Sequence, residues 1–248
     1  MSEDTGEDLA VKTHATARRL GDRVFQCDAT AVCTMPDGTR VYALLDVVGD
    51  TRAVRTWART TARRLARAAA GHGNAKAGLR TEYERYVADP ARQYPDLPAA
   101  AVVAVHVFGG WFSVAWSGDA RAYLLLDESG GSLRQLTEDH NARRACDGHG
   151  DRNLITACLD GARNDAETEQ HWGHSAIESL SGPPRPGLLL VSDGAYEPHG
   201  DDPHDLTGYL NGDPHDAAER LVDDAVCRAR AQRNPYADNA TALIARIT

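Results

Sequence analysis

Long apolar runs and a secretory leader are both missing from the 248-residue sequence. No stretch approaches the roughly 18 to 20 apolar residues that a membrane-spanning helix needs. The acidic start, residues 1–8, lacks the basic and then apolar regions of a secretory signal. We therefore expect a soluble, cytoplasmic protein without a membrane partner.

Paired cysteines and excess positive charge are also missing. The cysteines, Cys27, Cys33, Cys146, Cys158 and Cys227, are scattered and contain no Cys-x-x-Cys pair. This pattern indicates neither a disulfide framework nor a zinc ribbon, and it fits a reducing compartment. The 27 basic against 36 acidic residues give a net charge of -9. Such a balance disfavours a general nucleic-acid or anionic-membrane binder.

The sequence contains no internal repeat, no low-complexity tract and no linker rich in proline, glycine or serine. Apolar residues make up 42% of the chain, which is enough for a sizeable core. We expect a flexible acidic segment over residues 1–19 and a single domain over residues 20–248. We also expect a monomer.

Hydrophobic periodicity divides the domain into strands and helices. Strands are predicted over 22–34, 40–48, 187–192 and 240–247, with a further antiparallel meander over 99–108, 111–117 and 121–127. Helices are predicted over 50–70, ending at Gly71, over 76–88, and from Pro214 to about Arg230. The first two strands form a hairpin around Pro36-Asp37-Gly38. This order predicts an α+β layered fold with antiparallel sheets.

Asp28, Asp46, Asp193 and Asp238 each lie at or near the end of an apolar strand. A carboxylate at a core edge costs desolvation energy unless something neutralises it. If several converged, each close pair would repel by about 4 kcal/mol at ~4 Å and an effective dielectric of ~20. A divalent ion with oxygen ligands would remove that repulsion. Spacing alone leaves open the alternative that each aspartate only forms a turn.

Seven short motifs, in order, add to this pattern. They are Arg23-x-x-x-x-Asp28, Leu-Leu-Asp46, Gly118-Asp119-Ala-Arg121, Leu136-Thr-x-Asp139-His140, Arg152-Asn-Leu-Ile-Thr156, Leu190-Val-Ser-Asp193-Gly194 and Asp238-Asn239-Ala-Thr241. Together they resemble the successive motifs of the PP2C (PPM) family of metal-dependent serine/threonine protein phosphatases, bacterial type, over about residues 20–248.

The resemblance implies a four-layer αββα sandwich, with two packed antiparallel β-sheets flanked by helices and a metal site at one end. It also implies a signalling hydrolase whose partners are phosphorylated proteins and a cognate kinase or its targets. Two Mn²⁺ or Mg²⁺ ions, or three, would be the cofactors. The implied roles are a bridging carboxylate (Asp46), a backbone carbonyl ligand (Val47), ligands of one ion (Asp193, Asp238), a third-ion ligand (Asp119), action through metal-bound water (Asp28) and phosphate binding (Arg23).

The sequence departs from the family where Asp46-Val47-Val48-Gly49 replaces the usual Asp-Gly-x-Gly. Valine tolerates a positive φ poorly, which puts the loop geometry in question. Val48 also stands where many eukaryotic members have a histidine proposed as general acid. A catalytically weak or inactive module that binds phosphoproteins or regulates is therefore the alternative. Retention of Asp46, Asp193 and Asp238 favours the enzyme.

Two further groups of residues are predicted to be structural. The stretch 147–150, Asp-Gly-His-Gly, matches the family's Asp-Gly-x-Gly motif, but at a different place in the sequence. No apolar strand precedes it and no helix follows it. We predict a polar loop there. His140 is predicted to make structural hydrogen bonds and not to act as a base.

Overall fold

The computed structural model describes residues 13–90, 98–127, 131–159, 164–183 and 185–247, which form two five-stranded antiparallel sheets. The order in the first sheet, here called the β10 sheet, is β1 (His14–Arg19), β10 (Ala240–Arg246), β9 (Gly187–Val191), β6 (Arg121–Leu125) and β7 (Leu133–Gln135). The order in the second, the β3 sheet, is β2 (Ala29–Thr34), β3 (Arg40–Val48), β4 (Ala99–Phe108), β5 (Trp111–Ser117) and β8 (Glu178–Gly182).

Two groups of helices cover the sheets. The long helices are α1 (Arg52–His72), α2 (Ala75–Val87) and α6 (Pro214–Ala231). The short ones are α3 (Ala142–Ala145), α4 (Asp165–Trp172), α5 (Asp193–Tyr196) and a 3₁₀ helix, η2 (Pro203–Tyr209). None of the helices in these described segments combines the length and apolarity needed to cross a bilayer.

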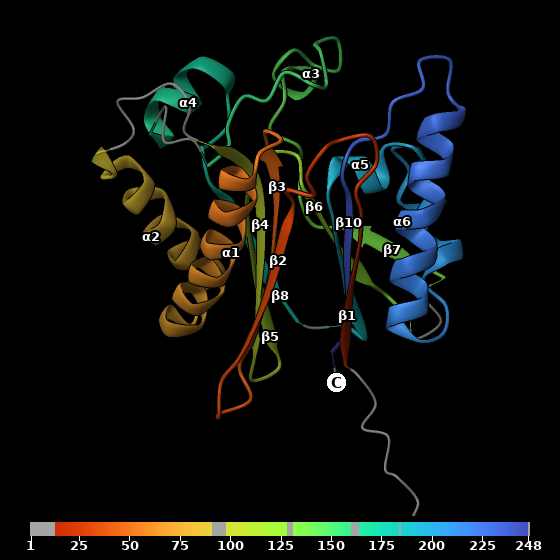
Figure 1. The fold of residues 1–248 in the computed structure, drawn as a ribbon. Helices are drawn as coiled ribbons and strands as arrows, with labels where there is room; N and C mark the ends of the chain where they lie inside the picture. The colour runs from red at the N-terminus through yellow and green to blue at the C-terminus, as the bar shows by residue number, and fades with distance from the viewer. Residues whose placement is uncertain (1–12, 91–97, 128–130, 160–163, 184, 248) are drawn as a thin grey trace, which may run out of the picture.

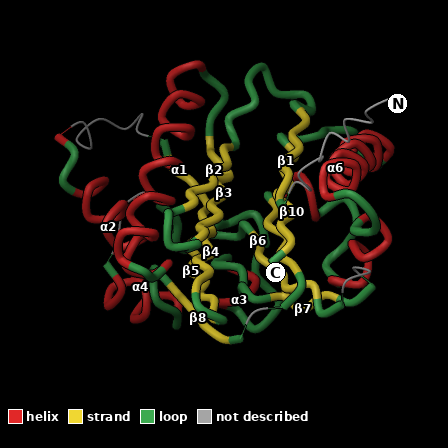
Figure 2. Tube along the Cα trace, turned by 90° about the horizontal axis from the view of Figure 1, so that it is seen from below, coloured by secondary structure: helices red, strands yellow, loops and turns green. Residues whose placement is uncertain are grey.

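Three apolar clusters separate the layers. Leu65 and Leu79 bring α1 and α2 against the β3 sheet, and Leu221 brings α6 against the β10 sheet. Side chains such as Leu44 and Leu190 fill the space between the two sheets. Figures 1 and 2 show the result, with the two sheets in the middle and helices outside each. The predicted αββα sandwich is therefore confirmed.

The predicted domain boundary at residue 20 is wrong. Strand β1, which lies within the segment expected to be flexible, pairs with β10 from His14↔Ala245 to Arg19↔Ala240. Ala15 and Ala17 turn toward the core on alternate positions. Alanine and arginine are weak strand formers, so the alternation gives little signal in the sequence. Residues 1–12 of the predicted segment lie outside the described residues.

The predicted meander is only half right. Strands β4 and β5 form a hairpin, but β6 crosses to the other sheet and pairs there with β7 and β9. Gly118 makes the crossing, with φ +110° and room for no side chain, since a Cβ would lie 2.4 Å from the Cβ of Ala101. The crossing places Asp119 at the end of the sandwich where β3 ends.

The predicted end of the first long helix is also wrong. Helix α1 runs through Gly71 to His72 and ends at Gly73, whose φ of 62° is left-handed. Thr51 caps its N-terminus, where its side chain accepts a hydrogen bond from the backbone N–H of Val54. A glycine within the last turn costs only about 1 kcal/mol, and tertiary packing outweighs that cost here.

Candidate metal and phosphate site

A cavity of about 580 Å³ lies at one end of the sandwich, the upper end in Figure 1, where β3 ends and α5 begins. Its lining includes Asp46 from the end of β3, Asp119 from the β5–β6 crossing, Asp193 from the start of α5, and Asp238 from the segment before β10. Arg23 lines it too. The structure thus brings together acidic residues that are far apart in the sequence.

Asp46 and Asp193 are in direct contact. The backbone N–H of Asp193 donates to Asp46 Oδ2 at 3.0 Å. Burial raises the pKa of Asp46 well above its usual range, and the charges of Asp193, Asp28 and Asp119 raise it further. Burial also raises the pKa of Asp193. The two carboxyls therefore occupy a site where negative charge is poorly compensated.

Asp28 lies deeper, with 1% of its surface exposed. Thr241 Oγ1 donates to its Oδ2 at 2.8 Å. Burial raises the pKa of Asp28 to about 8, and the charges of Asp193 and Asp238 add to the effect. Asp119 follows the same pattern, because burial and the charge of Asp193 raise its pKa well above the usual range.

Arg23 contacts a predicted metal ligand. Its Nε donates to Asp238 Oδ1 at 2.8 Å and its Nη2 to Asp238 Oδ2 at 2.6 Å. Asp22 fixes the adjacent segment of the same chain, because its side chain accepts a hydrogen bond from the backbone N–H of Ala237 at 2.8 Å. Gly21 allows this close approach, since a Cβ at its φ of +64° would lie 2.3 Å from the carbonyl oxygen of Asp238. This ion pair occupies groups that both predicted roles, phosphate binding by Arg23 and metal ligation by Asp238, would use.

Val47, which replaces the usual glycine, and Val48 after it fit the chain without strain. Val47 and Val48 are the last residues of β3, paired with Ala100 and Ala99. The positive φ of the loop, +122°, falls on Gly49. The Val47 side chain is buried, whereas that of Val48 is exposed at the cavity. The substitution therefore alters the surface of the cavity and leaves the backbone path available.

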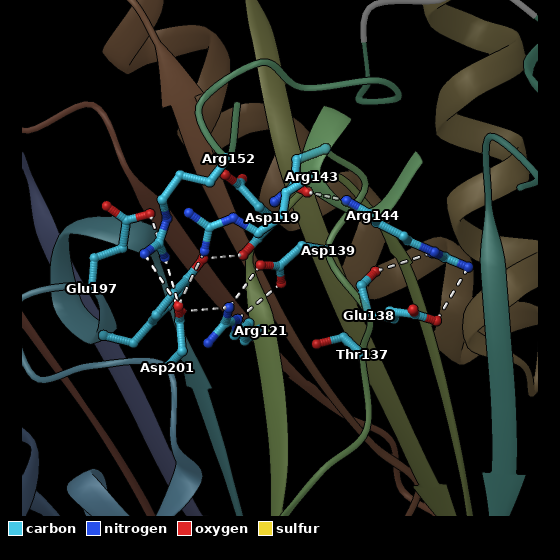
Figure 3. Close-up of polar contacts among 12 residues, drawn as sticks. Asp119, Arg121, Thr137, Glu138, Asp139, Arg143, Arg144, Arg152, Glu197 and Asp201 are labelled. Carbon is cyan, nitrogen blue, oxygen red and sulfur yellow. Dashed lines mark hydrogen bonds and ion pairs between the residues drawn. The ribbon is translucent and has the colours of Figure 1, made fainter. Parts of the chain in front are cut away.

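A network of arginines and carboxylates joins the cavity wall to the sheet (Figure 3). Arg121 holds Asp139 through two hydrogen bonds of 2.9 and 2.7 Å and reaches Asp201 at 3.2 Å. Arg152, which lines the cavity, contacts Glu197 at 2.8 Å and Asp201 at 3.0 Å. The network attaches residues 151–159 to α5 and β6.

Glu197 and Asp201 also belong to this part of the structure, although neither was predicted from the sequence. Burial and the charge of Asp193 raise the pKa of Glu197 to about 7. Glu197 follows Asp193 by four residues, one helical turn, which is the only signal that could have drawn attention to it. Asp201 lies in a polar loop and gives no such signal.

The residues predicted to be structural behave as expected. His140 is buried, where its Nδ1 accepts from the backbone N–H of Gly118 at 3.3 Å and its Nε2 lies 3.2 Å from Glu178 Oε2. The 147–150 stretch follows α3 as a turn, mostly exposed. Among the described cavity-lining residues, none belongs to it. It is therefore a surface loop.

The donor set fits Mg²⁺ or Mn²⁺, although the side chains are not arranged around an ion. Within the described ranges, no group of three or more histidine, cysteine, aspartate or glutamate side chains has the geometry to hold a metal. Carboxylate and carbonyl oxygens are nevertheless the ligands that these ions prefer. Burial first, and then the neighbouring carboxylates, raise the pKa values of Asp46, Asp119 and Asp193, and a dication would offset both effects.

Comparison with known proteins shows what the chain resembles. It matches no protein-family model, and a search of curated proteins finds no relative. Solved structures do match. The serine/threonine phosphatase PstP/Ppp of Mycobacterium tuberculosis is 22% identical, with 94% of this chain and 97% of that chain covered and a TM-score of 0.69.

Two further structures give the same picture. The catalytic domain of PstP in complex with two manganese ions is 22% identical, with 94% of this chain and 96% of that chain covered and a TM-score of 0.65. PppA, a regulatory component of T6SS in Pseudomonas aeruginosa, is 24% identical, with 95% and 98% covered and a TM-score of 0.67. The resemblance predicted from the motifs is thus confirmed for the fold: the chain has the sandwich of the bacterial PP2C-type serine/threonine phosphatases.

Proposed function

We propose that the protein hydrolyses phosphoserine and phosphothreonine in other proteins with the help of bound Mn²⁺ or Mg²⁺. The observation that carries the proposal is the convergence of Asp46, Asp119, Asp193 and Asp238 with Arg23 on one cavity. The names of the structural neighbours, serine/threonine phosphatases, support it, and so do the two manganese ions in one of them.

In this proposal Asp46, the Val47 carbonyl, Asp193 and Asp238 would hold two ions, and Asp119 together with Asp193 would hold a third, weaker one. Such ions would lower the pKa of a water and offset charge on the phosphoryl oxygens. Asp28, which accepts a hydrogen bond from Thr241, is buried and would act through water.

Arg23 supplies the phosphate contact. A guanidinium presents two parallel N–H groups to a phosphate as well as to a carboxylate. The guanidinium of Arg23, which donates two hydrogen bonds to Asp238, would bind a phosphoryl group in the same two-point geometry. Val48 has no proton to give, so this side chain cannot protonate the departing serine or threonine oxygen.

A regulatory, phosphoprotein-binding module is the second candidate. The Arg23–Asp238 ion pair favours it, because an internal cation competes with the metal for a ligand. Retention of the acidic residues argues against it, since a fold used only for binding has no need of several buried carboxylates that raise one another's pKa.

Hydrolysis of p-nitrophenyl phosphate and of a phosphothreonine peptide, with and without Mn²⁺, tests the proposal. We expect Mn²⁺-dependent turnover by the wild type and a loss of roughly 10- to 100-fold or more in Asp193→Asn. The exposed Asp216→Asn on α6 is the matched control and should behave as wild type. Equal rates in wild type and Asp193→Asn, or no dependence on the ion, would contradict the proposal. Calorimetric titration that finds one ion or none at millimolar Mn²⁺ would favour the regulatory module.

A further inference from the structure

Two exposed large apolar side chains, Val48 and Tyr236, line the cavity, and two more, Val24 and Leu154, belong to residues that adjoin cavity-lining residues in the sequence. Val24, Val48, Leu154 and Tyr236 have 72, 69, 53 and 53% of their surface exposed, and they are four of the ten exposed large apolar side chains among the described residues. Val48 and Tyr236 line the cavity directly. Val24 follows Arg23, and Leu154 lies between Asn153 and Ile155, all three of which are cavity residues. We call these four side chains the apolar rim.

The chain segments that carry the apolar rim are held in place. The backbone N–H of Val24 donates to Asp50 Oδ2 at 2.7 Å, and the carbonyl of Leu154 accepts from Ala142 at 2.8 Å. Val48 ends β3 in register with Ala99. The apolar rim is therefore a property of the folded site.

The spacing of residues along a peptide determines which part of a bound substrate contacts the apolar rim. Consecutive residues of an extended peptide are spaced by about 3.3 to 3.6 Å. When a phosphorylated side chain enters the cavity toward Arg23, the residues on either side of it cannot leave the mouth. These flanking residues therefore lie against the apolar rim, which adjoins the cavity.

The chemistry of the site selects among possible neighbours. Apolar side chains gain from contact with Val24, Val48, Leu154 and Tyr236, because both partners lose contact with water. Charged neighbours gain no such apolar contact, and a charge placed against apolar surface loses part of its hydration. We propose that the apolar rim recognises apolar residues next to the phosphorylated serine or threonine, so that the substrates are phosphoprotein segments with apolar flanks. This inference rests on the proposed phosphatase function.

Three phosphothreonine peptides of equal length test the substrate class, with leucine and valine, arginine and lysine, or aspartate and glutamate beside the phosphothreonine. We expect kcat/KM for the apolar peptide to exceed that for each charged peptide about tenfold, mostly through KM, since one apolar contact changes discrimination by roughly 10-fold or more. Hydrolysis of p-nitrophenyl phosphate, which has no flanking residues, serves as the reference.

Variants of the apolar rim test the residues. The double variant Val24→Ser/Leu154→Ser should reduce the preference for the apolar peptide about tenfold. The matched control is Trp111→Ser, which removes an equally exposed apolar side chain (62%) at the β4–β5 hairpin tip. That tip lies at the far end of β4 from Ala101, which pairs with Asp46, so the control should keep the wild-type preference.

Three results would overturn the proposal: equal kcat/KM for all three peptides, a preference for a charged peptide, or a preference that the double variant retains. Failure of the phosphatase function itself is distinguishable, because then neither p-nitrophenyl phosphate nor any peptide is hydrolysed. In that case fluorescence anisotropy of the three labelled phosphopeptides decides. Preferential binding of the apolar peptide supports the rim, and equal binding refutes it.

Discussion

Replacing Asp28 by asparagine should stabilise the metal-free protein. Asp28 is 1% exposed, and burial raises its pKa to about 8. Asparagine has nearly the same shape, and its amide oxygen can still accept the hydrogen bond that Thr241 Oγ1 donates at 2.8 Å. The substitution therefore removes an ionisable group with little change in packing.

The sign of the effect follows from proton binding. Below about pH 4 the Asp28 carboxyl is protonated in both the folded and the unfolded protein. Between about pH 4 and pH 8 the unfolded chain loses this proton while the folded protein keeps it, so the free energy of unfolding falls as the pH rises. A pKa change from about 4 to about 8 corresponds to about 5 kcal/mol. The charges of Asp193 and Asp238 share in that value, so we expect a gain of about 2 to 5 kcal/mol at pH 8.

Thermal unfolding in the presence of a chelator, followed by circular dichroism from pH 4 to pH 8, measures the effect. A protein of this size changes its Tm by about 2 to 4 °C per kcal/mol, so Asp28→Asn should unfold roughly 4 to 20 °C higher than wild type at pH 8. The two should unfold together near pH 4. The exposed Asp216→Asn is the control for loss of one negative charge. A gain of the same size at both pH values, or no gain at pH 8, would refute the reasoning.

Three further predictions concern the crossing, the ion pair and the arginine network. Gly118→Ala should lower the free energy of unfolding by about 2 to 4 kcal/mol in urea titrations, because its Cβ meets the Cβ of Ala101 at 2.4 Å; an unchanged midpoint would contradict this. Arg23→Gln should bind Mn²⁺ more tightly in calorimetric titrations without phosphate, because it frees Asp238, and should raise KM for a phosphopeptide; weaker Mn²⁺ binding would count against the competition. Asp201→Asn should speed hydrogen exchange in residues 151–159 about tenfold, because Arg152 loses one partner; unchanged exchange would show that the network does not hold this segment.

The helices and strands that could be predicted from the sequence are those whose apolar residues recur at the spacing of the side that packs against the core. Leu65 on α1 and Leu221 on α6 face the core at helical spacing, and the residues of β9 form a continuous apolar run because both faces are buried. Strand β1 escaped prediction because alanine and arginine have low strand propensity. The sheet to which β6 belongs could not be inferred, because a two-residue turn and a crossing at Gly118 look alike in the sequence.

The residues of the candidate site also fall into two groups, those that could be predicted from the sequence and those that could not. Each aspartate could be noticed because a carboxylate at the end of an apolar strand is unusual. The pairing of Arg23 with Asp238 could not be predicted, because 215 residues separate them and both suit several partners. Asp201 depends on Arg121 and Arg152, which only the fold brings together.

Val48 links the chemistry of the site to its specificity. An aliphatic side chain cannot transfer a proton, so in a phosphatase this position contributes nothing to the departure of the serine or threonine oxygen. It is nevertheless 69% exposed at the cavity. Exposed apolar surface gives the folded protein no stability, and it gains free energy only when another apolar surface covers it. In the proposed reaction, a peptide substrate is the partner that reaches this point. A valine here therefore favours binding of apolar sequence beside the phosphate, at a position where a histidine would favour proton transfer.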